Sequence, residues 1–163
     1  MHDTRTVALS KGAAPWSYRR RIAELCTLEL DGRRLRLANC HLAFDDADER
    51  LAQAEPLLAR LHPGTFVVGD LNARPGGDVL RLLLGAGLRD AWAELHPDAT
   101  DTDGVTNWRS RDLDDRPANR LDCILVPQGY QVVTATVPCA VDSDLTAFRR
   151  LSDHRPGAPT AHR

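Results

Sequence analysis

The chain has 163 residues, of which 42% are hydrophobic and 27% are charged, and its formal net charge is −2 at pH 7. This length and composition are typical of one soluble globular domain with its own core, and we expect a single domain over residues 1–163. The near-neutral charge argues against a strong non-specific nucleic-acid binder, which normally carries a basic excess, but it leaves binding at a local site open.

The cysteines and the apolar segments predict where the protein resides. Cys26, Cys40, Cys123 and Cys139 form no C-x-x-C pair, which argues against a zinc site, and we expect them to be reduced core residues. No signal peptide is visible and no apolar run reaches membrane-spanning length, so we expect no transmembrane segment and a cytoplasmic protein.

Residues 22–40 predict a β-hairpin with Asp31-Gly32 as its two-residue turn. Alternation along the second strand then gives one inward face that starts apolar and becomes polar at the strand's end. The residues of this face are Leu35, Leu37, Asn39 and His41.

Two helices and a strand are expected next. Residues 45–62 have the apolar spacing of a helix, with Asp45 or Asp46 as its N-cap, and Pro56 should kink it or split it in two. Residues 65–70 form an apolar strand. A shorter helix follows, with Asp78 as N-cap and a glycine at its end, either Gly85 or Gly87.

The remainder of the chain predicts a long surface loop over 96–119 and strands over 120–126 and 130–137. The Pro/Gly-rich residues 157–163 are expected to be a frayed tail, because proline cannot donate to a strand ladder. Strands mixed with helices place the protein in the α/β or α+β class.

Four segments carry residues whose chemistry needs an explanation. Asp122 lies within an apolar strand, where a carboxylate is costly unless it is paired, for example with Arg120 or a backbone amide. Asp153 precedes His154, which is either an idle loop histidine or one partner of a dyad with Asp122.

The other two segments lie at strand ends. His41 is either a core histidine with a satisfied hydrogen bond or a catalyst. Asp70 and Asn72 follow a strand in the spacing that projects both side chains the same way in an extended chain, yet both residue types are also common in turns.

Taken in order, the segments "NCHL", "GDLNARP", "TNW", "NRLDCIL" and "LSDHRP" resemble the signature series of the endonuclease/exonuclease/phosphatase family. The resemblance runs from about Val7 to Pro156. It implies a sandwich of two β-sheets flanked by helices. It also implies a phosphoesterase that uses Mg²⁺ or Mn²⁺, in which water attacks phosphorus in line with the leaving ester oxygen.

The resemblance also implies a role for each matching residue. Asp70 would orient or deprotonate the attacking water, and Asn72 would hold a phosphate oxygen. His154, steadied by Asp122, would contact the phosphate, and His41 would do likewise or protonate the leaving group. Asp153 would help to bind the metal. These oxygen and imidazole groups suit magnesium-assisted hydrolysis.

One family segment is not matched, namely the opening strand with an Asn and the later strand that ends in Gln-Glu. We therefore expect a domain incomplete at its N-terminus, with weakened metal binding and with unpaired strand edges that favour a partner chain or self-association. The alternatives to an active phosphoesterase are a non-catalytic remnant or partner-dependent fragment, and a zinc-dependent metallohydrolase. The substrate stays open among nucleic acid, a phospholipid head group and a sugar phosphate.

Overall fold

The computed structural model describes residues 3–10, 20–100, 103–107 and 120–137, together with the backbone of residues 158–162. Strands and helices are mixed along the chain, which confirms the predicted α/β class. The elements in chain order are β1 (Asp3–Ala8), β2 (Ile22–Leu30), β3 (Arg33–Cys40), α1 (Ala47–Leu58), β4 (Thr65–Asp70), α2 (Asp78–Gly85), β5 (Arg89–Asp90), α3 (Ala91–Leu95), β6 (Asp122–Val126), β7 (Gln131–Thr136) and β8 (Ala158–His162).

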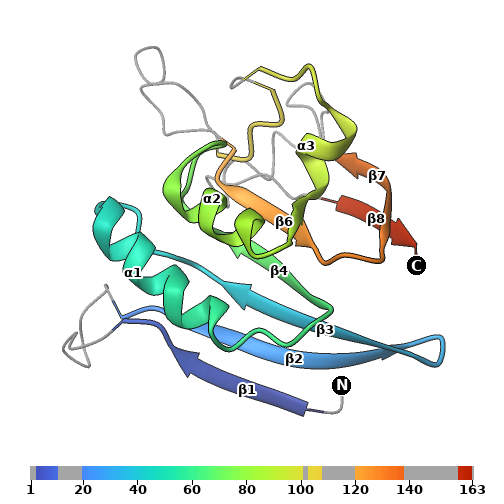
Figure 1. Ribbon diagram of the computed structural model, residues 1–163, viewed down its shortest axis with the longest axis horizontal. Helices are drawn as coiled ribbons and strands as arrows, with labels where there is room; N and C mark the ends of the chain where they lie inside the picture. The colour runs from blue at the N-terminus through green and yellow to red at the C-terminus, as the bar shows by residue number, and fades with distance from the viewer. Residues whose placement is uncertain (1–2, 11–19, 101–102, 108–119, 138–157, 163) are drawn as a thin grey trace, which may run out of the picture.

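The strands form two sheets. A six-stranded sheet has the order β1-β2-β3-β4-β6-β5, and β7 and β8 form a two-stranded sheet. Strands β3 and β4 are parallel, whereas the other neighbours in the larger sheet are antiparallel. A parallel pair needs a crossover connection, and α1 provides it (Figure 1). The carboxyl ends of β3 and β4 therefore lie at the same edge of the sheet, where they meet the beginning of β6.

The predicted hairpin is confirmed. Strands β2 and β3 are antiparallel, with Leu30 opposite Arg33 and Asp31-Gly32 between them. Both turn residues have positive φ, 50° for Asp31 and 73° for Gly32. Two positive φ values are what a type I′ hairpin turn requires, and Asp tolerates this conformation better than most residues.

The buried face of β3 is not the predicted one. Ala38 and Cys40 are buried at 0% and 4% exposure, whereas Asn39 and His41 are exposed. The reason is that α1 and α2 cover the opposite face of the sheet, where Ala38 and Cys40 join Leu57 and other helix residues in the main core. Figure 1 shows both helices on this side of the strands.

Helix α1 begins and continues as one element. The Asp46 carboxylate caps it by accepting hydrogen bonds from the backbone N–H groups of Asp48 and Glu49, at 3.0 and 3.1 Å, which confirms Asp46 as N-cap. Pro56 lies inside the helix but does not split it. Only two helical residues follow this proline. The backbone hydrogen bond that proline cannot donate is therefore missing only from the last turn, and the rest of the helix keeps its bonds.

Several boundaries differ from the expectations. Asp78 is the first residue of α2, and Gly77 is the N-cap, while Gly85 ends the helix as predicted. The tail expected to fray over 157–163 contains β8, which pairs antiparallel with β7. Its proline is compatible with a strand that has one neighbour. The short elements β1, β5 and α3 were not predicted.

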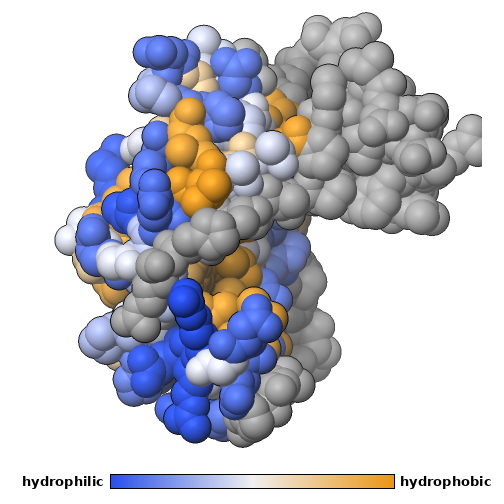
Figure 2. Space-filling view, turned by 90° about the vertical axis from the view of Figure 1, so that its right-hand side faces the viewer, coloured by the Kyte–Doolittle hydropathy of each residue, from blue (hydrophilic) through white to orange (hydrophobic). Residues whose placement is uncertain are grey.

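The largest fully buried side chains include Leu42, Leu57, Leu71, Leu80 and Leu125. Apolar side chains also reach the surface, among them Leu30 and Phe44, each 60% exposed. Figure 2 shows apolar patches between hydrophilic regions on one side of the molecule. Within the described residues, no helix is long and apolar enough to cross a membrane.

Candidate active site

His41 and Asp70 meet at the carboxyl ends of the parallel strands β3 and β4. The distance from His41 Nε2 to Asp70 Oδ2 is 3.4 Å. The His41 side chain is 56% exposed, whereas that of Asp70 is 10% exposed. His41 is therefore not the buried core histidine of the alternative interpretation, but a solvent-accessible imidazole held beside a nearly buried carboxylate.

The chain turns sharply after Asp70. Asn72 has a positive φ of 48°, and its backbone N–H donates to Asp70 Oδ1 at 2.8 Å. The extended geometry assumed for these two residues is thus wrong, because Asn72 adopts the left-handed conformation. Its side-chain Nδ2 reaches back and donates to the Leu42 carbonyl at 3.0 Å, so Asn72 joins the two strand ends.

Gly69 allows β3 and β4 to approach closely at the site. Its φ is 123°, and a Cβ placed on it would lie 2.0 Å from the Cys40 carbonyl oxygen. Only glycine avoids this overlap and readily adopts this φ. The glycine of "GDLN" is therefore required because the residue before Asp70 contacts the residue before His41.

Asp122 lies opposite Asp70. The two aspartates are register partners in the antiparallel β4–β6 pair, so their side chains project to the same face of the sheet. Like charges in directly opposite positions destabilise a sheet. The two carboxylates therefore concentrate negative charge at the sheet edge where His41 also lies.

Thr106 fixes the chain that leads into β6. Its hydroxyl oxygen accepts hydrogen bonds from the backbone N–H groups of Leu121 and Asp122, both at 3.0 Å, and Thr106 is 3% exposed. Leu71 N–H donates to the Leu121 carbonyl at 3.0 Å. The segment 105–107 is thus buried rather than part of a surface loop, because it is bound to β6.

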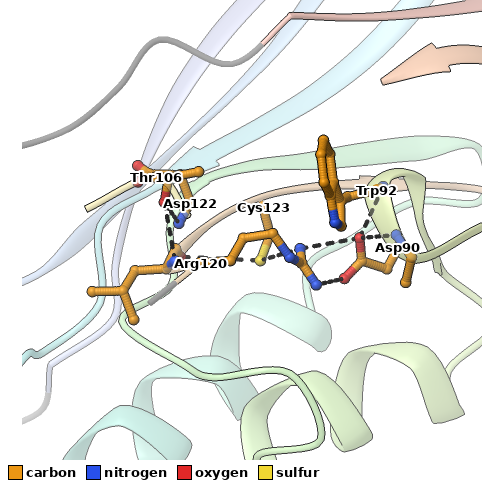
Figure 3. Close-up of polar contacts among 8 residues, drawn as sticks. Asp90, Trp92, Thr106, Arg120, Asp122 and Cys123 are labelled. Carbon is orange, nitrogen blue, oxygen red and sulfur yellow. Dashed lines mark hydrogen bonds and ion pairs between the residues drawn. The ribbon is translucent and has the colours of Figure 1, made fainter. Parts of the chain in front are cut away.

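A buried ion pair supports the wall next to Asp122. Arg120 donates to both carboxylate oxygens of Asp90, at 3.1 and 2.6 Å, and the two side chains are 5% and 6% exposed. Figure 3 shows the guanidinium directed toward Asp90 and away from Asp122. The sequence suggests Arg120 as a partner for Asp122, but its guanidinium forms the ion pair with the Asp90 carboxylate.

Asp90 also organises α3. Its Oδ1 accepts hydrogen bonds from the backbone N–H groups of Trp92 and Ala93, at 3.1 and 3.2 Å (Figure 3). Trp92 stacks on His96 with ring centroids 3.9 Å apart, and His96 Nε2 lies 3.1 Å from the Ala135 carbonyl oxygen. The ion pair therefore connects β6, through α3, to β7.

A cavity of about 260 Å³ opens next to Asp122; its lining includes Gly69 but neither Asp70 nor His41. Polar groups from Asn39, Thr106 and Asp122 lie at its wall, and Trp92 and Ile124 are among its apolar lining. The cavity thus combines one carboxylate, an amide and an apolar surface, a mixture that is common in small-molecule pockets.

Two thiols lie under the site, on the helix-covered face. Burial, with a smaller contribution from the Asp70 charge, raises the pKa of Cys40 to about 12. Burial also raises the pKa of Cys123 to about 12, although the Arg120 charge opposes the shift. Both thiols are therefore protonated at neutral pH and act as core residues.

The structure brings together four of the predicted site residues, namely His41, Asp70, Asn72 and Asp122. Asp153 and His154 lie outside the described residues, so their roles remain predictions. Thr106 belongs to the quoted "TNW" motif but was given no role. The Asp90–Arg120 pair was missed because 30 residues separate its partners.

The endonuclease/exonuclease/phosphatase family model matches residues 8–154. The chain belongs to this family. The match extends through every motif quoted above as far as His154, including the strand ends that carry His41 and Asp70. A search of curated proteins found no match.

Solved structures share the fold of this family member. A conserved protein of unknown function from Enterococcus faecalis is 24% identical, with a TM-score of 0.71 over 98% of this chain and 65% of that one. A mannosyl-6-phosphatase from Bacteroides thetaiotaomicron is 16% identical, with a TM-score of 0.69 over 99% and 66%. D. rerio TDP2, complexed with single-strand DNA product, is 18% identical, with a TM-score of 0.67 over 99% and 67%. The chain spans 45–65% of the length of the first three similar structures.

Proposed function

We propose that the protein is a metal-dependent phosphoesterase that hydrolyses a phosphodiester or phosphomonoester by in-line attack of water. The observation that carries the proposal is that three groups meet at one edge of the sheet. Asp70 and Asp122 are directly opposite each other on the adjacent strands β4 and β6, and His41 Nε2 lies 3.4 Å from Asp70 Oδ2. Membership of a family of nucleases and phosphatases supports a hydrolase.

The donor set at this edge suits a hard divalent cation. Mg²⁺ is commonly bound through one or two carboxylates, with water and substrate phosphate completing its shell. Asp153 is the predicted ligand, and the charges of Asp70 and Asp122 at the same edge would favour a cation there. Within the described ranges, His, Cys, Asp and Glu form no group of three or more that could hold a metal, and Asp153 lies outside these ranges. The bound ion would stabilise charge on the phosphate.

The chain's own residues carry the proton transfers. We assign Asp70 to orient the attacking water and to accept its proton, since the carboxylate is held in place by the Asn72 N–H. His41 is exposed beside it and is placed to donate to a phosphate oxygen or to the leaving oxygen. The second Nδ2 hydrogen of Asn72 is assigned to a phosphate oxygen, and His154, steadied by Asp122, is assigned to stabilise the developing charge.

The substrate is assigned only as a phosphate ester, from among nucleic acid, phospholipid head group and sugar phosphate. Two of the similar structures support this range, because one is named for a sugar phosphatase and another holds a DNA product.

Hydrolysis of bis(4-nitrophenyl) phosphate and 4-nitrophenyl phosphate, with Mg²⁺, with Mn²⁺ and with EDTA, tests the proposal. We expect metal-dependent turnover that falls by at least about 100-fold in Asp70→Asn, as expected for loss of a general base. Asp31→Asn, in the hairpin turn at the other end of β3, should retain activity. Turnover that resists EDTA, or that is equal in both variants, would overturn the assignment.

The competing proposal is a non-catalytic or partner-dependent fragment. It is motivated by the share of the first three similar structures that the chain spans, which is 45–65% of their length. Absence of hydrolysis of both esters at millimolar Mg²⁺ and Mn²⁺ by folded protein would select it. A zinc-dependent hydrolase would instead show activity restored by zinc after chelation.

A further inference from the structure

The two residues after His41 have every backbone polar group engaged. Leu42 N–H donates to the Asp70 carbonyl at 2.9 Å, and the Leu42 carbonyl accepts from Asn72 Nδ2 at 3.0 Å. Ala43 N–H donates to Gln53 Oε1 at 2.9 Å, and the Ala43 carbonyl accepts from Arg50 Nη1 at 2.8 Å. The segment is therefore fixed to the end of β4 on one side and to α1 on the other.

Gln53 is the central residue of the α1 contact. It is 0% exposed, although glutamine is rarely fully buried. Its Oε1 binds Ala43, and its Nε2 donates to Ser10 Oγ at 3.0 Å and to Glu49 Oε1 at 2.8 Å. A buried amide without hydrogen-bond partners would destabilise the fold. An apolar side chain of the same volume would need no such partners. The position thus holds an amide whose hydrogen bonds reach the segment after His41.

This attachment matters because more than half of the His41 side chain is exposed. Its ring is 56% exposed, yet its Nε2 lies 3.4 Å from Asp70 Oδ2. An exposed side chain on a mobile backbone would sample many positions, and catalytic groups lose efficiency when they are displaced by about 1 Å. Leu42 and Ala43 are 0% and 2% exposed, so the backbone next to His41 is buried, whereas more than half of the ring is exposed.

We propose that Gln53 is a positioning residue for His41: through the Ala43 peptide, it sets the distance between the His41 imidazole and the Asp70 carboxylate. Arg50 acts with it on the carbonyl side of the same residue. The inference rests on the proposed hydrolytic function for its catalytic consequence, but the placement of His41 can be measured without activity.

The activity test is a double-mutant cycle. Gln53→Met keeps the length of the side chain and removes its hydrogen bonds, and it should lower kcat by about 10- to 100-fold with a smaller change in KM, as expected for a displaced catalytic group. In a His41→Ala background the same substitution should change kcat less than about 2-fold, because residues that act through one another are not additive. Equal losses in both backgrounds would overturn the proposal.

Leu57→Ala is the matched control. Leu57 lies on the same helix and is also 0% exposed, but its side chain makes no hydrogen bond to the segment after His41. It should lower stability and leave kcat per folded molecule within about 3-fold of wild type, because a core truncation acts through packing. A loss of kcat equal to that of Gln53→Met at equal stability would show a merely structural role.

A nuclear magnetic resonance experiment separates this proposal from the function. The His41 ring resonances should change in Gln53→Met and stay unchanged in Leu57→Ala. The Ala43 amide should exchange faster in Gln53→Met than in Leu57→Ala when the two variants are compared at equal global stability. If wild-type protein is inactive, the proposed function fails, and these signals still decide the placement of His41. Unchanged His41 signals would overturn it. Should Gln53→Met not fold, Arg50→Met provides the same measurements from the carbonyl side.

Discussion

Removing the cation of the buried Asp90–Arg120 pair should destabilise the fold strongly. Arg120→Met keeps much of the apolar stem and leaves the Asp90 carboxylate, 6% exposed, without its guanidinium partner. Breaking a buried ion pair at one partner typically costs about 3–5 kcal/mol. Asp90 keeps two backbone donors, Trp92 and Ala93, so we expect the lower end, about 3 kcal/mol.

Urea unfolding followed by circular dichroism measures this loss, and thermal unfolding should show a fall in Tm of roughly 6–12 °C. Arg81→Met is the matched control, because the Arg81–Asp78 ion pair is exposed, with both side chains at 67%. Exposed pairs contribute about 0–1 kcal/mol. Both substitutions replace the arginine of an Arg–Asp ion pair by methionine. The difference between their free energies of unfolding therefore reports the effect of burial.

The double variant Asp90→Asn/Arg120→Met tests the reasoning further. Asparagine keeps an oxygen for the α3 cap and removes the uncompensated charge, so the combined loss should be smaller than the sum of the single losses by at least about 1 kcal/mol. Additive losses, or a loss below about 1 kcal/mol in Arg120→Met, would refute the idea that the buried charges depend on each other.

Three other predictions concern a close backbone approach, a helix cap and two buried thiols. Gly69→Ala places a methyl group against the Cys40 carbonyl and should cost more than about 3 kcal/mol or abolish soluble expression, whereas Gly85→Ala, with no atom in the way, should be neutral or stabilising. Asp46→Ala should lower the free energy of unfolding by about 1 kcal/mol in urea, and Asp46→Asn should not, because asparagine also caps. The pKa of the Cys40 and Cys123 thiols is about 12 in the fold, against 9.0 for a free thiol. Between these values the unfolded chain binds fewer protons than the native one, so stability should fall as pH rises from 9 toward 12; replacing both thiols by alanine should flatten this slope.

Local patterns were sufficient to predict most of the secondary structure. The Asp31-Gly32 turn and the Asp46 cap each depend on residues within a few positions of one another, and the structure confirms both. Strand β1 has one buried position, Val7, and β5 has two residues, so neither leaves a periodic pattern in the sequence.

The site was predictable where the family motifs lie and not where distant residues meet. His41, Asp70 and Asp122 were expected together, and the structure places them at one edge. The burial of β3 was assigned to the wrong face because alternation gives two faces and does not say which one the helices cover. Gln53 has no local signal, since its partners are Ser10 and Ala43, and only the fold brings these to α1.

The pairing of β4 with β6 has a consequence for how the protein acquires its site during folding. Asp70 and Asp122 come together only after the chain between them has closed into a long loop, and long-range pairings of this kind form slowly. His41 and Asp70, by contrast, are connected through the shorter β3–α1–β4 crossover. The imidazole and the first carboxylate can therefore assemble before the second carboxylate arrives, so the docking of β6 would be the step that completes this edge of the sheet.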